Sequence, residues 1–163
     1  MLLVAVMVST MALGAFPIVG TAVVATFLAR DLGMSLTLFG AGVAVNTLFG
    51  AIFAPLSGQI SDRHGGKWSC VLVLTSAGIG LIIVAFATSP VGLVLGLLVS
   101  SYGQGACNPA TNKLVAERAA PGRRGTLTGI KQSGVQLGIL MGGFTLPTLT
   151  IWFNWRIAIG LYG

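Results

Sequence analysis

Long apolar runs, separated by short polar stretches, constrain the fold of this chain more than any other feature. The sequence has 163 residues, of which 55% are hydrophobic and 7% are charged, and its mean hydropathy is +0.94. Soluble domains carry about 25% charged residues, so a chain with this few cannot cover its apolar surface in water. A lipid bilayer removes that requirement. The composition therefore predicts an all-α membrane protein.

The lengths of the apolar runs predict the number of membrane spans. A transmembrane helix needs about 20 mostly apolar residues. We therefore predict six spans, at 1–28, 37–57, 68–88, 91–115, 126–148 and 156–163. The sixth is incomplete, because even a helix over 150–163 would be only about 21 Å long, against a hydrocarbon core about 30 Å thick. We expect the chain to be a truncated part of a longer protein.

The stretch Gly58–Lys67 is a polar island between two of these runs. It carries one acidic residue, two basic residues and a histidine, and a charged side chain costs about 2.5–3.5 kcal/mol at the bilayer centre. The adjacent Gly65 and Gly66 allow the backbone to reverse tightly. The island therefore predicts a loop at the membrane surface, and the polar stretch 113–125 predicts a second loop.

The basic residues predict how the chain is oriented. Arg30 and Arg156 fall on one side of the predicted membrane. The other side holds Arg63, Lys67, Lys113, Arg118, Arg123 and Arg124. Cytoplasmic loops carry the excess of lysine and arginine. Both predicted loops, and with them the amino terminus, are therefore expected on the cytoplasmic side of the plasma membrane.

The polar residues of the chain do not form a reaction centre. Cys70 and Cys107 lie inside apolar runs, where a free thiol behaves as a small hydrophobic group. His64 is the single histidine, so no metal-ligand cluster or nucleophile–base pair is predicted. The net charge is +6, and the basic residues cluster in two short loops without forming the basic runs of nucleic-acid-binding proteins. We therefore expect no enzymatic activity, no cofactor, no metal and no nucleic-acid partner.

The island resembles the loop between helices two and three of the major facilitator superfamily of secondary transporters, which carries the pattern G-x-L-a-D-R-x-G-R-K. The matching residues are Gly58, Asp62, Arg63, Gly65 and Lys67. Ile60 replaces the leucine of the pattern, and Gly66 replaces its arginine. Residues 121–125 are similar to the family's P-x-x-R-G, and Trp155-Arg156 is similar to the W-R that opens helix six.

The resemblance covers the whole chain and implies that residues 1–163 are the amino-terminal six-helix half of a twelve-helix fold, with the sixth helix truncated. It implies a secondary transporter that moves a small solute across the plasma membrane by alternating access. The implied partners are the lipid bilayer, a small-molecule substrate, and either a missing carboxyl-terminal half or a second copy of the chain. The alternative is a membrane-embedded structural or regulatory fragment without transport activity.

The charged residues of the two loops are candidates for a gate. Asp62 can accept hydrogen bonds from Arg118, Arg123 or Arg124, or lie at the amino end of another helix, and Glu117 can pair with Arg63. Such contacts hold helix ends together and must break when the two halves rock. Alternatively, these charges only set the topology. The candidate gate residues are Gly58, Asp62, Arg63, Gly65, Lys67, Glu117, Arg118, Arg123 and Arg124.

Glycines on the fifth predicted span indicate close helix packing. Gly134, Gly138 and Gly142 share one helical face, and Gly143 follows directly. The run is similar to the family pattern G-x-x-x-G-P-x-x-G-G, with Ile139 in place of the proline. That pattern is associated with proton-driven exporters, whereas the residues themselves favour ordinary close packing between helices.

Amides and one lysine within the spans are candidates for a substrate cavity. Gln104, Asn108 and Asn112 recur every four residues on the fourth span, and the fifth adds Lys131 and Gln136. Polar groups facing lipid are costly, so we expect these five residues to line a water-filled cavity. Lys131 either snorkels to the cytoplasmic edge or attracts an anionic substrate. All three acidic residues lie near helix ends, so a proton relay would need an acid from outside this half.

Overall fold

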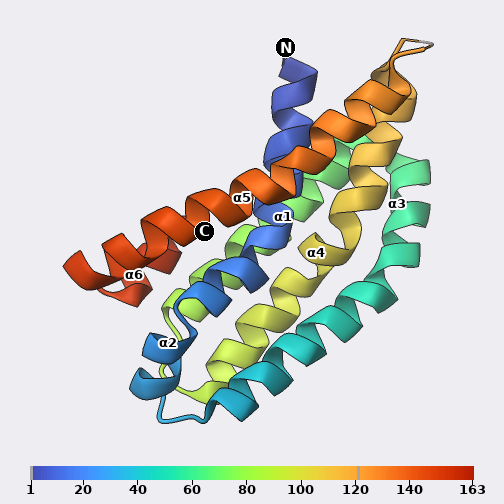
Figure 1. Ribbon diagram of the computed structural model, residues 1–163. Helices are drawn as coiled ribbons and strands as arrows, with labels where there is room; N and C mark the ends of the chain where they lie inside the picture. The colour runs from blue at the N-terminus through green and yellow to red at the C-terminus, as the bar shows by residue number, and fades with distance from the viewer. Residues whose placement is uncertain (1, 121) are drawn as a thin grey trace.

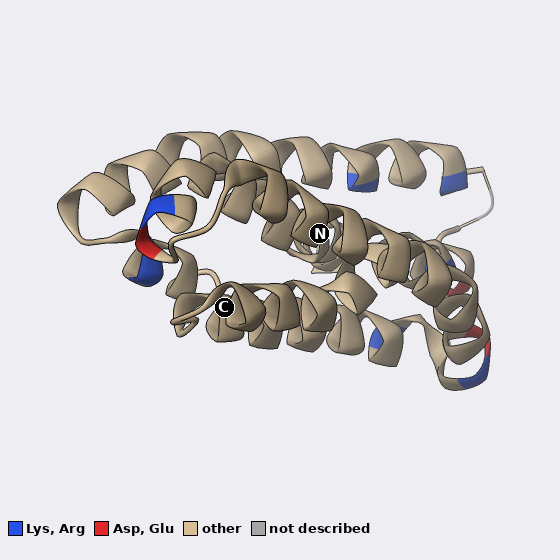
Figure 2. Cartoon of the chain, turned by 90° about the horizontal axis from the view of Figure 1, so that it is seen from below, with Lys and Arg blue, Asp and Glu red and all other residues tan. Residues whose placement is uncertain are grey.

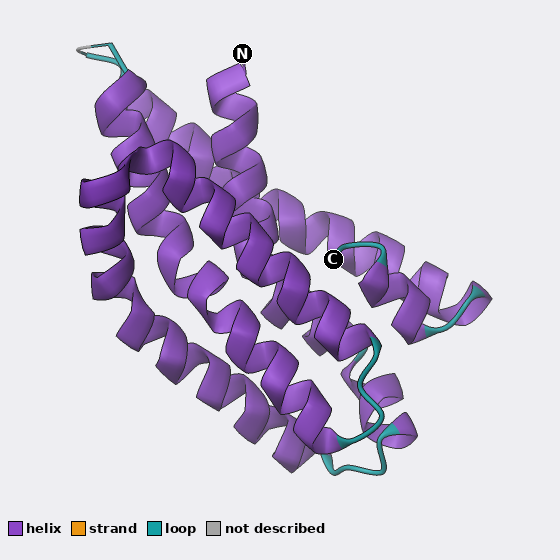
Figure 3. Cartoon of the chain, turned by 180° about the vertical axis from the view of Figure 1, so that it is seen from behind, coloured by secondary structure: helices purple, strands orange, loops and turns teal. Residues whose placement is uncertain are grey.

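The computed structural model describes residues 2–120 and 122–163, all of them in helices or the short loops between helices, with no strand in these two ranges (Figure 3). Met1 and Pro121, which belong to the predicted first span and to the predicted 113–125 loop, lie outside the described residues. The helices are α1 (Leu2–Val23), α2 (Ala25–Asp31), α3 (Leu36–Ala85), α4 (Pro90–Arg118), α5 (Arg124–Trp152) and α6 (Trp155–Gly160).

Four helices, α1, α3, α4 and α5, are long and apolar enough to cross a membrane. Helix α3 has 50 residues, which corresponds to about 75 Å of helix, more than twice the hydrocarbon core. It is broken at Gly65, whose φ of 83° is accessible mainly to glycine. The two arms of α3, residues 36–64 and 66–85, run in opposite directions (Figure 1). The predicted all-α membrane fold is confirmed.

The predicted loops are shorter than the sequence suggests. Residues 58–64 continue the first arm of α3, and the second arm begins at Gly66, so the chain reverses at Gly65 alone. Helix α4 likewise continues to Arg118, well into the predicted 113–125 loop. Helical hydrogen bonding is as available at the membrane surface as inside it, and these polar residues tolerate helix. Polarity therefore marked the end of the bundle but not the end of the helix.

Helices α1 and α5 pack closely along the glycine-bearing face of α5. A methyl group added at Gly134 would collide with the carbonyl of Val8, one at Gly138 would lie 3.0 Å from the Ala12 carbonyl oxygen, and one at Gly142 would lie 3.0 Å from the Phe16 ring. Gly143 points into open space instead. Three glycines thus set the α1–α5 distance, and the fourth does not contribute.

The ends of the bundle carry most of the charge. The amino terminus, the reversal at Gly65 and the loop between α4 and α5 lie at one end, whereas the 32–35 and 86–89 loops lie at the other (Figure 1). Lysine, arginine and the acidic residues gather mainly at these two ends, and the middle of the bundle is almost free of them (Figure 2). This separation is the one expected of a protein that spans a bilayer.

Candidate functional site

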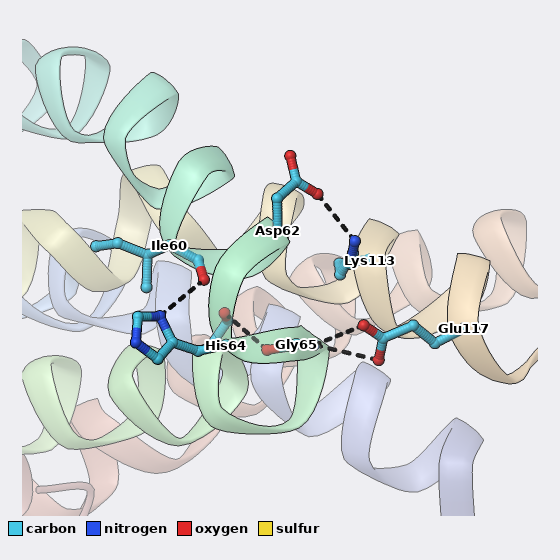
Figure 4. Close-up of polar contacts among 8 residues, drawn as sticks. Ile60, Asp62, His64, Gly65, Lys113 and Glu117 are labelled. Carbon is cyan, nitrogen blue, oxygen red and sulfur yellow. Dashed lines mark hydrogen bonds and ion pairs between the residues drawn. The ribbon is translucent and has the colours of Figure 1, made fainter.

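Asp62 on α3 forms an ion pair with Lys113 on α4, with 2.9 Å between Oδ1 and Nζ (Figure 4). The side chains are 74% and 29% exposed, respectively. Asp62 does not pair with any of its predicted arginine partners, Arg118, Arg123 and Arg124. Lys113 is the basic side chain of α4 that lies beside Asp62, whereas Arg118 is more than one turn further along α4 and the other two follow its end.

Glu117 binds the start of the second arm of α3, and not Arg63, the partner predicted from the sequence. Its two carboxylate oxygens accept from the backbone N–H of Gly66 at 3.3 and 3.2 Å (Figure 4). That N–H has no intrahelical partner because Gly66 opens the helix, and a carboxylate there is favoured by the helix dipole, by about 0.3–1 kcal/mol. Glu117 therefore joins the end of α4 to the beginning of the second arm.

Gly66 also allows the two helices to touch. A methyl group on Gly66 would lie 2.6 Å from the backbone nitrogen of Leu114 and 2.7 Å from its Cα. Only a residue without a side chain fits at this distance. Gly65, Gly66 and Glu117 therefore form one unit, in which the reversal, the close approach and the helix cap depend on one another.

The remaining charged candidates lie on the surface around this unit. Lys67 places Nζ 5.9 Å from the centre of the Trp68 ring, and Arg124 donates to the carbonyl of Ala116 at 3.3 Å. Arg63, Arg118 and Arg123 are exposed and form no ion pair within the described part of the chain. Gly58 has open space around it.

The amide stripe of α4 is only partly buried. Asn108 and Asn112 are exposed and Gln104 is half-buried, and Gln136 is exposed on α5. Lys131 is different, because the residue is 1% exposed and its ammonium donates to Asn108 Oδ1 at 3.2 Å and to Thr111 Oγ1 at 2.9 Å. The ammonium therefore bonds inward to α4 and does not snorkel to the surface. The structure joins Lys131 to Asn108 and leaves Asn112 and Gln136 apart from it.

Three residues form contacts between helices that were not predicted from the sequence, namely Lys113, Thr111 and Asn46. Asn46 is fully buried and donates through Nδ2 to the Leu97 carbonyl and, at 3.1 Å, to Ser100 Oγ. A lone amide in an apolar span is a signal that could have identified Asn46, because such groups require a polar partner. Lys113 was expected only to contribute to the excess of basic residues on the cytoplasmic side. Thr111 gave no signal, since a threonine in a helix ordinarily bonds its own backbone.

Within residues 2–120 and 122–163, histidine, cysteine, aspartate and glutamate do not come together in groups of three or more that could hold a metal ion. The polar contacts instead join helices α3 and α4 at one end and helices α4 and α5 further inside.

These features define a multi-pass, all-α membrane protein whose polar groups hold helix ends together and whose α4 exposes amides. The sequence profile of the Major Facilitator Superfamily matches residues 2–163. The chain belongs to this superfamily.

Curated relatives have transporter names and different substrates. A hexuronate transporter of Bacillus subtilis is 27% identical over 139 residues, covering 85% of this chain and 33% of the relative. A gallate transporter of Pseudomonas putida is 27% identical over 133 residues, covering 82% and 30%. A triacylglyceride transporter of Mycobacteroides abscessus is 32% identical over 127 residues, covering 72% and 25%. The chain thus spans a third or less of the length of these relatives.

Proposed function

We propose that this chain forms one half of a secondary transporter, which moves a small solute across the plasma membrane by alternating access. Membership of the Major Facilitator Superfamily supports this proposal. So do the names of its relatives, which are transporters of hexuronate, gallate and triacylglyceride. We propose transport without covalent chemistry, and therefore neither enzymatic activity nor a cofactor.

One observation carries the proposal, namely the exposed amide stripe on α4. Asn108 and Asn112 are exposed on a helix that is apolar enough to cross a membrane. Amides facing hydrocarbon lose hydrogen bonds to water, and each unsatisfied group costs several kcal/mol. A water-filled cavity against a second half satisfies them. That second half comes either from the same polypeptide or from a second copy of the chain.

We propose that the Gly65 end of the bundle is cytoplasmic and takes part in gating. The excess of basic residues at this end supports the orientation. Asp62–Lys113 and Glu117–Gly66 hold the ends of α3 and α4 together, so this half moves as a unit when the halves rock. Asp62 remains 74% exposed and is available to the second half.

Reconstitution into liposomes tests the proposal. The intact protein is incorporated into proteoliposomes, and uptake of radiolabelled glucuronate, gallate and glucose is compared with protein-free vesicles. We expect saturable uptake of at least one solute. Absence of flux across a wider panel of sugars, organic anions and amino acids, with correctly inserted protein, would leave a non-transporting membrane subunit as the function. Flux from the 163-residue chain alone would indicate a homodimer of halves.

A further inference from the structure

Lys131 is buried, and no acidic side chain within residues 2–120 and 122–163 pairs with its ammonium. The sequence contains three acidic residues, and each has another partner. Asp31 accepts from Trp155 Nε1 at 2.7 Å, Asp62 pairs with Lys113, and Glu117 binds the Gly66 N–H. The partners of Lys131, Asn108 and Thr111, are neutral. A buried ion without an opposite charge is strongly unfavourable, so the site favours an anion from outside.

Lys131 fixes the orientation of the Asn108 side chain. The ammonium donates to Oδ1 of Asn108 at 3.2 Å, so this end of the amide faces the lysine. The Nδ2 group is the other branch of the same planar amide, and it is not the atom that the ammonium contacts. Asn108 is exposed, whereas Lys131 is buried behind it. The exposed face of α4 thus presents an N–H donor group backed by a positive charge.

Thr111 completes this arrangement. Its hydroxyl donates to the Cys107 carbonyl at 2.6 Å, so a lone pair is available to accept from Lys131 at 2.9 Å. An ammonium has three N–H donors, and these contacts use two of them. These two contacts with α4 therefore hold the Lys131 ammonium in place. The ammonium is buried and is joined to the exposed Asn108 amide by a single hydrogen bond.

We propose that Asn108 and Lys131 form a binding position for the anionic oxygen group of the solute, so that the transported solute is an organic anion. The Asn108 Nδ2 group donates to the anion, and Lys131 is the positioning residue that orients this amide and supplies the charge. Asn112, one turn along the same stripe, has no such support from a cation. This inference rests on the proposed transport function.

Matched ligand pairs test the preference for an anion. Gallate and pyrogallol differ by a carboxylate, as do glucuronate and xylose, and inorganic phosphate tests the oxyanion alone. Thermal unfolding of the intact protein is followed with a thiol-reactive dye, since Cys70 and Cys107 are buried in the folded state. We expect the anions to raise the Tm and the neutral partners to leave it unchanged. A response to phosphate alone identifies a phosphorylated solute as the better substrate class.

Substitution of Asn108 gives the sharper test. Asn108→Asp places a carboxylate 3.2 Å from the ammonium, so we expect a higher Tm without ligand and no further rise on adding anion. Asn108→Ala removes the donor and is expected to lose the anion response without the gain in Tm. Asn112→Asp is the matched control and should retain the response. Lys131→Gln is expected to weaken anion binding at least about tenfold, and Lys131→Arg to preserve it.

The possible results separate this inference from the transport function. Equal stabilisation by neutral and anionic partners, or an unchanged anion response in Asn108→Asp, would overturn the anion site. Flux of neutral solutes without preference for anions would also overturn it, yet leave the transporter intact. Anion binding with the expected pattern among the variants, but no flux of any solute, would overturn the transport function alone.

Discussion

Asp62 illustrates at the residue scale an ion pair that leaves most of one side chain exposed. It pairs with Lys113, and 74% of its side chain remains exposed. An exposed ion pair contributes little to stability, so loss of the pair is not expected to unfold the protein. A functional effect of an Asp62 substitution would therefore not be explained by unfolding.

We predict that Asp62→Asn abolishes transport by the intact protein while its insertion and Tm remain near those of the wild type. Lys113→Met is the matched variant, because it breaks the same ion pair and retains the carboxylate. Loss of transport in both variants would assign the gate to the pair, whereas loss in Asp62→Asn alone would assign it to a contact with the second half. Wild-type flux by Asp62→Asn would remove Asp62 from the gate.

At the element scale, Gly66 determines how closely the second arm of α3 approaches α4. We predict that Gly66→Ala lowers stability by about 1–3 kcal/mol, because the new methyl group overlaps the Leu114 backbone. Gly58→Ala is the control, since nothing lies within 4 Å of a methyl group there, and alanine is the better helix former by up to about 1 kcal/mol. Dye-monitored thermal unfolding compares the two. Equal Tm values would show that α3 and α4 separate without cost.

The glycine face of α5 provides a second comparison between elements. We predict that Gly134→Ala lowers the Tm, because its methyl group would meet the Val8 backbone of α1. Gly143→Ala should leave the Tm unchanged or raise it, as its methyl group meets nothing within 4 Å. Thermal unfolding of both variants in the same detergent measures the difference. A similar fall in the Tm of both variants would show that the substitutions destabilise α5 itself and not its packing against α1.

At the scale of the whole molecule, the distribution of basic residues predicts the orientation in the membrane. Ala120 and Thr88 are exposed and lie at opposite ends of the bundle, and the natural cysteines are buried. We predict that a membrane-impermeant thiol reagent labels Ala120→Cys only in inverted vesicles. Thr88→Cys should be labelled in right-side-out vesicles. The reverse pattern would place the amino terminus outside and contradict the cytoplasmic gate.

The helical membrane fold could be predicted from the sequence because hydropathy is a local property. Runs of apolar residues must form helices in a bilayer, where every backbone group needs an internal partner. The glycines at 134, 138 and 142 were also recognisable, since their spacing places them on one helical face. Gly143 was not separable from them, because adjacent residues point about 100° apart and only the position of α1 decides which of them is covered.

The partners of the polar residues were decided by the tertiary structure. Asp62 pairs with Lys113 and with none of the three predicted arginines, and Glu117 accepts from a backbone N–H in place of pairing with Arg63. The rotation and register of α4 against α3 bring these groups within hydrogen-bond distance. Lys131 was predicted to face a cavity or the surface, and it is buried against Thr111. The sequence by itself determined that this protein is a helical membrane bundle with basic loops on one side. Hydropathy and charge are properties of consecutive residues and do not depend on how the helices pack. The pairing of the charged side chains was decided only by the packing of the helices. A shift of one residue along a helix turns a side chain by about 100° and so changes the group that it can contact.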